Sequence, residues 1–206
     1  MLASIGKTEN RPLSPQSRFT MSMEIRLSKE SHPEERRKIL HIHRQAFGAQ
    51  QGKEIVQLVD DLFDDVTAKP ILSLVASEGE TLLGHILFTK VTISGQEGKV
   101  SAQILAPLAV TPTAQGKGIG QELINEGLKL LKESGTDLVF VLGHPAYYPK
   151  CGFIPAGQHG LFAPYPIPEE HAEAWMVQDL RGTLLGKVSG TVQCSKTLNE
   201  PQHWRE

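Results

Sequence analysis

Apolar residues recur along this chain at two spacings, which predict strands in some segments and helices in others. Alternating apolar and polar positions, or short apolar runs, indicate strands, and apolar positions three or four residues apart indicate helices. We expect strands at residues 24–27, 71–76, 82–93, 100–110, 137–142, 174–180 and 188–198. Glu78-Gly79-Glu80 separates the second of these strands from the third, which favours a hairpin.

Helical spacing marks three further segments. The first helix is expected after Ser31 and Glu34, whose S-x-x-E spacing is that of a capping box, and it should end at Gly48. A second helix follows, with apolar positions of residues 55–63 on one face. The third, over residues 117–134, has the most regular spacing, and Gly135 follows it as a C-terminal stop.

The order of these elements predicts one mixed α/β domain over residues 23–206. Residues 1–22 lack periodicity, and we expect them to form a flexible N-terminal tail. The intervening segment at 155–168 is rich in Pro and Gly and has the length of a functional loop.

Composition narrows the function classes. The 206 residues carry a formal charge of −2, which argues against a nucleic-acid coat or a polybasic membrane binder. No apolar run approaches the roughly 18 residues of a membrane helix. The two cysteines, Cys151 and Cys194, form no disulfide framework and fit a reducing compartment, so we expect a cytoplasmic protein. No metal-ligand pattern is visible, and we expect no metal cofactor.

The most informative stretch is a glycine-rich turn between a strand and the most regular helix. It consists of Gln115, Gly116, Lys117, Gly118, Ile119 and Gly120. The first N–H groups of a helix have no intrahelical partner and attract anions, and glycines let a phosphate approach the backbone closely. The turn is therefore predicted to bind a phosphate group.

Two common phosphate motifs do not fit this turn. A Walker A loop needs Gly at position 111 and Ser or Thr at position 118, where the chain has Thr111 and Gly118. The dinucleotide pattern G-x-G-x-x-G needs Gly at 121 or 123, which are Gln121 and Leu123. The pattern that does fit is Q-x-x-G-x-G, over residues 115–120.

This pattern, after a strand and before a helix, resembles motif A of the GNAT family of N-acetyltransferases. The strand at 138–142 follows at the family's spacing, and Tyr148, Gly152 and Phe153 match its Y-x-x-x-G-F segment. The sequence around these motifs resembles that of a YhbS-like bacterial branch of the family. The resemblance extends over about residues 24–198. The resemblance implies a single GNAT-type domain with a mixed, mostly antiparallel sheet flanked by helices.

The resemblance also implies acetyl-CoA as co-substrate, with its pyrophosphate on the amides of residues 115–120. Pro107 interrupts a strand, and proline there indicates a bulge or an edge. In the family a bulge at this point splays two strands into a V-shaped cleft. The backbone of Leu108, Ala109 and Val110 is then expected to contact the pantetheine and polarise the thioester carbonyl.

The catalytic residue that the resemblance implies is Tyr148, which in the family protonates the departing thiolate of CoA; Tyr147 is the alternative if the register differs by one. Cys151 lies in the same segment, and we expect it to serve in packing, because the family transfers the acetyl group directly. No general base is evident, and His85 and His144 are the candidates.

Three functions remain open from the sequence. The first is direct acetyl transfer to an amine acceptor, either a small molecule or a protein amino group. The second is a non-catalytic acyl-CoA-binding or sensor domain, and the third is a partner-binding domain without CoA. We expect the acceptor site to lie between the two early helices and the segment 155–168, which includes His159, Phe162 and Tyr165. The resemblance leaves a homodimer open.

Overall fold

A computed structural model describes residues 22–204, so the expected flexible tail lies, except for Ser22, outside the described residues. The strands are β1 (Glu24–Leu27), β2 (Leu72–Glu78), β3 (Thr81–Ile93), β4 (Ala102–Val110), β5 (Leu138–Leu142), β6 (Ile154–Pro155), β7 (Leu161–Phe162), β8 (Trp175–Asp179) and β9 (Gly190–Gln193). Two α-helices, α1 (Pro33–Asp64) and α2 (Ile119–Glu133), accompany them. Short 3-10 turns lie at Val66–Ala68, Pro112–Ala114, Tyr148–Cys151, Gly157–His159, Glu169–Ala174 and Pro201–Trp204.

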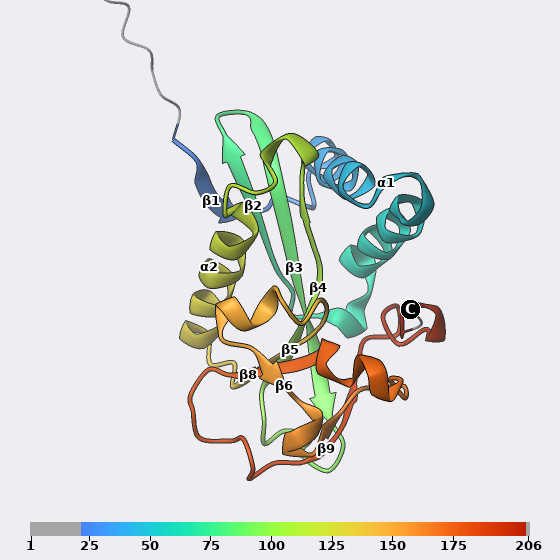
Figure 1. Ribbon diagram of the computed structural model, residues 1–206. Coiled ribbons are helices and arrows are strands. Elements are labelled where there is room, and N and C mark those ends of the chain that lie inside the picture. Colours follow the sequence, from blue (N-terminus) through green and yellow to red (C-terminus); the bar gives the residue numbers. More distant parts are fainter. Residues whose placement is uncertain (1–21, 205–206) are drawn as a thin grey trace, which may run out of the picture.

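The strands form one large, mostly antiparallel sheet in the order β1-β2-β3-β4-β5-β8-β6, with β9 pairing with β3 and with β7 (Figure 1). Within this order β4 and β5 run parallel, because α2 connects them across one face of the sheet. The predicted fold class, a mixed sheet flanked by helices, is confirmed.

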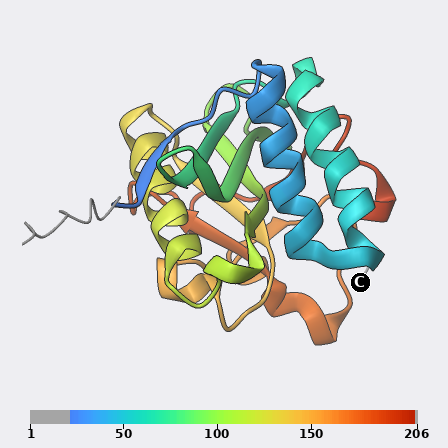
Figure 2. The same cartoon turned by 90° about the horizontal axis from the view of Figure 1, so that it is seen from above.

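The two α-helices cover opposite faces of the sheet (Figure 2). On one face α1 packs its apolar side chains against residues such as Leu87 and Ile104. On the other face α2 contributes Leu123 and Ile124 to a second apolar core. Each core excludes water from one side of β3 and β4, which fixes the orientation of both strands.

The helix α1 contains the two helices expected from the sequence. Gly48 interrupts it with φ 68° and ψ −163°, a backbone conformation that glycine tolerates better than other residues. The chain bends there, and the two halves of α1 lie side by side on the sheet (Figure 2). The predicted break at Gly48 is confirmed.

Several predicted boundaries are corrected by the structure. The capping box is wrong: helix α1 is capped by His32 without a side-chain hydrogen bond, and its first residue is Pro33. The carboxylate of Glu35, instead of Glu34, accepts a hydrogen bond from the backbone, at the N–H of Lys29. The last predicted strand, 188–198, is shorter in the structure, and the predicted loop at 155–168 contains the strand β7.

The predicted bulge at Pro107 is confirmed. Ile86 of β3 pairs with Leu108 of β4, whereas Phe88 pairs with Leu105, so Leu87 lies opposite two residues of β4. On its other side β4 pairs with β5 only from Ala102 to Leu105. Beyond Leu105 the two parallel strands separate, and β4 presents an unpaired edge.

Candidate active site

The glycine-rich loop forms the N-terminal end of α2. Gly116 and Gly118 both have positive φ, 75° and 85°, and a Cβ at either position would meet nothing within 4 Å. The first intrahelical hydrogen bond is donated by the N–H of Glu122 to the carbonyl of Gly118. The amides of residues 119–121 therefore have no partner within the helix.

A hollow of about 400 Å³ lies at this loop. Among the predicted loop residues, Gln115, Gly116, Gly118, Ile119 and Gly120 line it, but the side chain of Lys117 does not. Gln121 and Lys150 also line it, and the sequence reasoning missed both. The ammonium group of Lys150 supplies a positive charge beside the helix N-terminus, so the hollow suits a phosphate or pyrophosphate anion.

The unpaired edge of β4 leads away from the loop. The N–H of Thr111 donates to the carbonyl of Leu83 on β3, at 2.8 Å. Since backbone groups alternate along a strand, those of Ala109 face β3 as well, and those of Leu108 and Val110 face the open edge. The Val110 carbonyl accepts from the side chain of Gln115 at 3.0 Å, which agrees with this alternation.

A cleft of about 640 Å³ follows where β4 and β5 separate. The chain lines it from α1, from the bulge, from the end of β5 and from the C-terminal segment. Its lining residues are Phe47, Gln51, Glu54, Ile55, Leu58, Ile104, Leu105, Ala106, Pro107, Leu108, Leu142, Gly143, His144, Tyr147, Tyr148, Leu198, Gln202, His203 and Trp204. Tyr147 lines both this cleft and the hollow at the loop, so the two spaces adjoin.

The two tyrosines take different positions. A Cβ at Gly120 would collide with the Tyr147 hydroxyl, so the phenol of Tyr147 lies directly against the loop. A Cβ at Gly143 would collide with the ring of Tyr148, which lies on the backbone at the end of β5. Burial raises the pKa of Tyr148 well above its usual range. Its hydroxyl is therefore protonated at neutral pH, and it is a weaker acid than an exposed phenol.

The structure separates the two histidines proposed as bases. His85 is completely buried, and both its ring nitrogens have partners: Nδ1 lies 2.7 Å from Nε2 of His43, and Nε2 lies 2.9 Å from Oγ of Ser73. His144 lines the cleft, but its Nδ1 accepts a hydrogen bond from the N–H of Ala146 at 3.1 Å. In the neutral ring Nε2 then carries the proton. Neither nitrogen of either ring is available to accept a proton from an amine.

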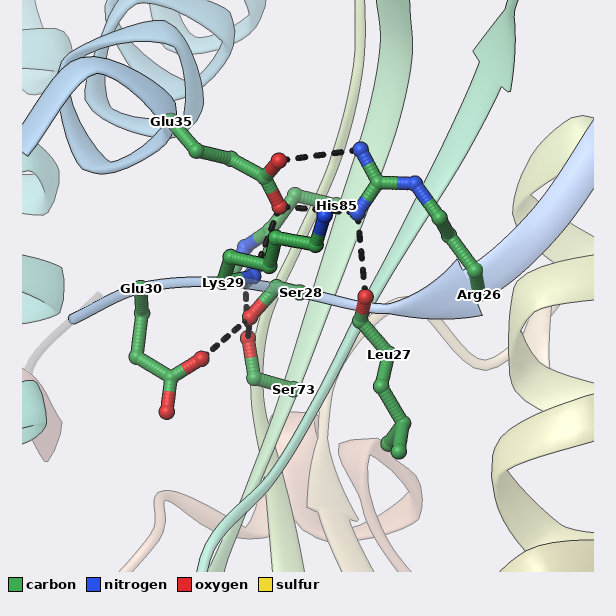
Figure 3. A network of polar contacts seen from close by, with 8 residues as sticks. All are labelled: Arg26, Leu27, Ser28, Lys29, Glu30, Glu35, Ser73 and His85. Atoms are coloured by element: carbon green, nitrogen blue, oxygen red, sulfur yellow. Dashed lines mark hydrogen bonds and ion pairs between the residues drawn. The ribbon is translucent and has the colours of Figure 1, made fainter. Parts of the chain in front are cut away.

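His85 belongs to a polar chain that runs from the buried interior to the partly buried Glu30 (Figure 3). The Oγ of Ser73 lies 2.6 Å from that of Ser28, and Ser28 donates to the carboxylate of Glu30, also at 2.6 Å. Because a carboxylate only accepts, each hydroxyl and imidazole N–H in the chain donates toward Glu30. The Nε2–H of His43 therefore donates to His85, and Nδ1 of His43 keeps a buried lone pair without a donor among the described residues.

This buried pair predicts a loss of stability in weak acid. Burial lowers the pKa of His43 from 6.5 to about 3, and burial together with His43 lowers that of His85. Below pH 6.5 the unfolded chain binds protons that the folded chain does not, so stability falls as pH falls. As the pH falls from 6.5 to about 5, each of the two histidines should lower the free energy of unfolding by about 1 kcal/mol per pH unit.

Urea unfolding at several pH values tests this expectation. His43→Gln should make the fall of the unfolding free energy shallower than in the wild-type protein. His41→Gln serves as the control, since His41 is exposed on the same helix and should leave the slope unchanged. Parallel slopes for wild type and His43→Gln would contradict the assignment of a neutral, buried His43.

The lining of the cleft agrees only in part with the walls predicted for the acceptor site. The α1 helix forms one wall of the cleft, as predicted, through Phe47 and Ile55 among others. No described residue of 155–168 lines the cleft. The C-terminal segment also lines the cleft, through Leu198, Gln202, His203 and Trp204, and it was not predicted from the sequence. Tyr165 supports this segment from behind, with its hydroxyl donating to the carbonyl of Asn199 at 2.8 Å.

One further candidate side chain, that of Cys151, can be placed. Cys151 is buried in the apolar core beside α2, in agreement with a packing role. Within residues 22–204, no cluster of three or more His, Cys, Asp or Glu side chains could hold a metal ion. None of the described helices combines the length and the apolar character that crossing a membrane requires.

A mostly antiparallel sheet that opens at a bulge, beside a glycine-rich loop at a helix N-terminus, is the architecture of the GNAT acetyltransferases. The chain belongs to this family: the model of the acetyltransferase (GNAT) domain matches residues 25–156. Among curated proteins, the uncharacterized N-acetyltransferase YjhQ of Escherichia coli K12 is 44% identical over 158 residues, which cover 76% of this chain and 85% of YjhQ.

The YhbS-like resemblance is confirmed as well. The uncharacterized N-acetyltransferase YhbS of Escherichia coli K12 is 34% identical over 69% of this chain and 82% of its own length. The crystal structure of Escherichia coli YhbS in complex with CoA superposes with a TM-score of 0.76 and 28% identity, covering 94% of this chain and 97% of that chain. A GNAT acetyltransferase from Brucella melitensis in complex with acetyl-CoA has a TM-score of 0.66 and 28% identity, covering 86% and 99%.

Proposed function

We propose that this protein is an acetyl-CoA-dependent N-acetyltransferase that transfers the acetyl group directly to an amine. The observation that supports this most strongly is the continuous path from the glycine-rich loop, past Tyr147, into the cleft that contains Tyr148. The relatives solved with CoA and with acetyl-CoA support the same ligand.

The chain's own residues fit this ligand. The free amides at the start of α2 and the ammonium group of Lys150 hold the pyrophosphate. The outward backbone groups of Leu108 and Val110 pair with the pantetheine, and one of these amides donates to the thioester carbonyl. The predicted contact of Ala109 is left out of this arrangement, because strand alternation directs its backbone groups toward β3.

In the reaction the amine nitrogen forms a bond to the thioester carbon, and the carbon–sulfur bond breaks. The amide at the edge of β4 stabilises the negative charge on the carbonyl oxygen, a contribution of about 3 kcal/mol for comparable single donors. Tyr148 gives its proton to the departing thiolate, the nitrogen of the new amide loses one proton to solvent, and Tyr148 regains one from solvent. Holding both reactants in one cleft accounts for much of the remaining rate.

Calorimetry with acetyl-CoA, followed by a panel of amines assayed for thiol release, tests the proposal. We expect acetyl-CoA to bind in the micromolar range and at least one amine to be acetylated. Binding without turnover over the whole panel would favour a CoA-binding sensor. The absence of acetyl-CoA binding would overturn the proposal. The cytoplasmic location, the choice between small-molecule and protein acceptors, and the homodimer remain predictions from the sequence.

A further inference from the structure

The walls of the cleft have an uneven distribution of charge. Aliphatic and aromatic side chains make up most of them, among them Phe47, Ile55 and Trp204. Among the described residues that line the cleft, Glu54 is the one carboxylate, and neither Lys nor Arg is present. The positive group of the site, Lys150, lines the neighbouring hollow at the loop instead. The cleft is therefore mostly apolar, and the exposed Glu54 carries its single negative charge.

This distribution selects among amines. A free amine is mostly an ammonium ion at neutral pH, so Glu54 attracts it to the rim before the transfer. An acceptor that also carried a carboxylate or phosphate would bring a negative charge into an apolar space without a cationic partner, which costs free energy. The same apolar walls favour a hydrocarbon or aromatic body on the acceptor.

The cleft also contains one imidazole with free nitrogens. His203 lies on the C-terminal wall, and its ring makes no hydrogen bond among the described residues. Burial lowers its pKa, while the carboxylates of Glu200, Glu54 and Asp61 act in the opposite direction. The ring is therefore neutral at pH 7, and unlike His85 and His144 it has a nitrogen able to accept a proton.

Resting on the proposed N-acetyltransferase function, we infer that the acceptor is an apolar monoamine without an anionic group, attracted by Glu54 and deprotonated by His203. The ammonium gives one proton to His203, which releases it to solvent, and the neutral nitrogen attacks the thioester. As the carbon–sulfur bond breaks, the nitrogen loses a second proton to solvent and becomes the amide nitrogen. The proposed role of Tyr148 is unchanged. This step supplies the base that the sequence did not reveal.

The first experiment compares matched acceptors. Phenethylamine should be acetylated with a kcat/KM about tenfold above that of phenylalanine, which adds only a carboxylate, and phosphoethanolamine should be a poor acceptor. Glu54→Gln should raise the KM of phenethylamine by about five- to tenfold. It should also reduce the ratio of kcat/KM between phenethylamine and phenylalanine. Glu133→Gln is the matched control, an exposed carboxylate of α2 on the other face of the sheet.

The second experiment tests His203 through the pH profile. In wild type, the acid-side fall of kcat/KM should lie below pH 6.5, the ordinary histidine value from which burial lowers the pKa of His203. In His203→Gln it should drop at least about tenfold at pH 7 and rise with pH toward the pKa of the amine. Trifluoroethylamine, which is largely neutral at pH 7, should be least affected by this substitution. His41→Gln is the control, because His41 is exposed on α1 and does not line the cleft, and it should keep the wild-type profile.

The outcomes separate this inference from the proposed function. Absence of turnover with every amine would overturn both. Turnover that favours anionic acceptors, or that Glu54→Gln leaves unchanged, would overturn the acceptor class while leaving the acetyltransferase intact. A wild-type pH profile in His203→Gln, with the variant folded by circular dichroism, would remove His203 as the base.

Discussion

Replacing Gly118 by aspartate should abolish acetyl-CoA binding, with Kd raised more than about 100-fold in calorimetry. The new carboxylate would occupy the open space beside the α2 amides and repel the pyrophosphate. A negative charge at a helix N-terminus is favourable for the helix itself, so α2 should remain formed. The loss should therefore concern the ligand rather than the fold.

Gly98→Asp is the matched control for this substitution. Gly98 lies in the turn between β3 and β4 with φ 74°, and a Cβ at this position would meet nothing within 4 Å, as at Gly118. The two variants share the backbone strain and the added charge, and differ in their distance from the candidate site. Retained binding in Gly118→Asp would exclude the loop as the pyrophosphate site, and equal losses in both variants would indicate a general effect on folding.

Tyr148→Phe should lower kcat by about 100-fold at neutral pH and change the Kd of acetyl-CoA by less than about twofold. The ring remains on Gly143 and keeps its contact with Phe153, so the substitution removes the proton donor and little packing. Single-turnover assays with a saturating amine would measure the chemical step directly. An unchanged kcat would remove Tyr148 from the mechanism.

The neighbouring Tyr147→Phe variant discriminates between the two phenols. Its hydroxyl lies against Gly120 at the loop, so we expect its loss to affect the KM of acetyl-CoA more than kcat. The reverse result, with kcat lost in Tyr147→Phe and retained in Tyr148→Phe, would transfer the acid role to Tyr147.

Local sequence signals predicted most of the fold because they act within one element. The spacing of apolar residues located α2 and the central strands, and a proline within a strand indicated the bulge. The start of α1 was misplaced because two carboxylates compete there. Glu35 is bound by the guanidinium of Arg26 and the N–H of Lys29, and this tertiary arrangement moves the cap to His32.

The candidate site was predictable only where its residues form a contiguous motif. The loop at 115–120 and Tyr148 belong to such motifs, whereas Glu54 and His203 come from separate elements that meet only in the folded chain. The residues at 198–204 have no periodicity that would signal a wall. They are held in place by tertiary packing, with Trp204 against Trp175 at 5.8 Å between ring centroids.

Because of this packing, intrinsic tryptophan fluorescence can report on the cleft. The chain contains two tryptophans, and they are the pair that meets behind the cleft: Trp204 lines it, and Trp175 lies buried beneath. The entire tryptophan emission thus originates at the acceptor wall rather than at the glycine-rich loop. Quenching or a spectral shift on adding an amine would report occupancy of that wall alone, without a label and before any chemistry takes place.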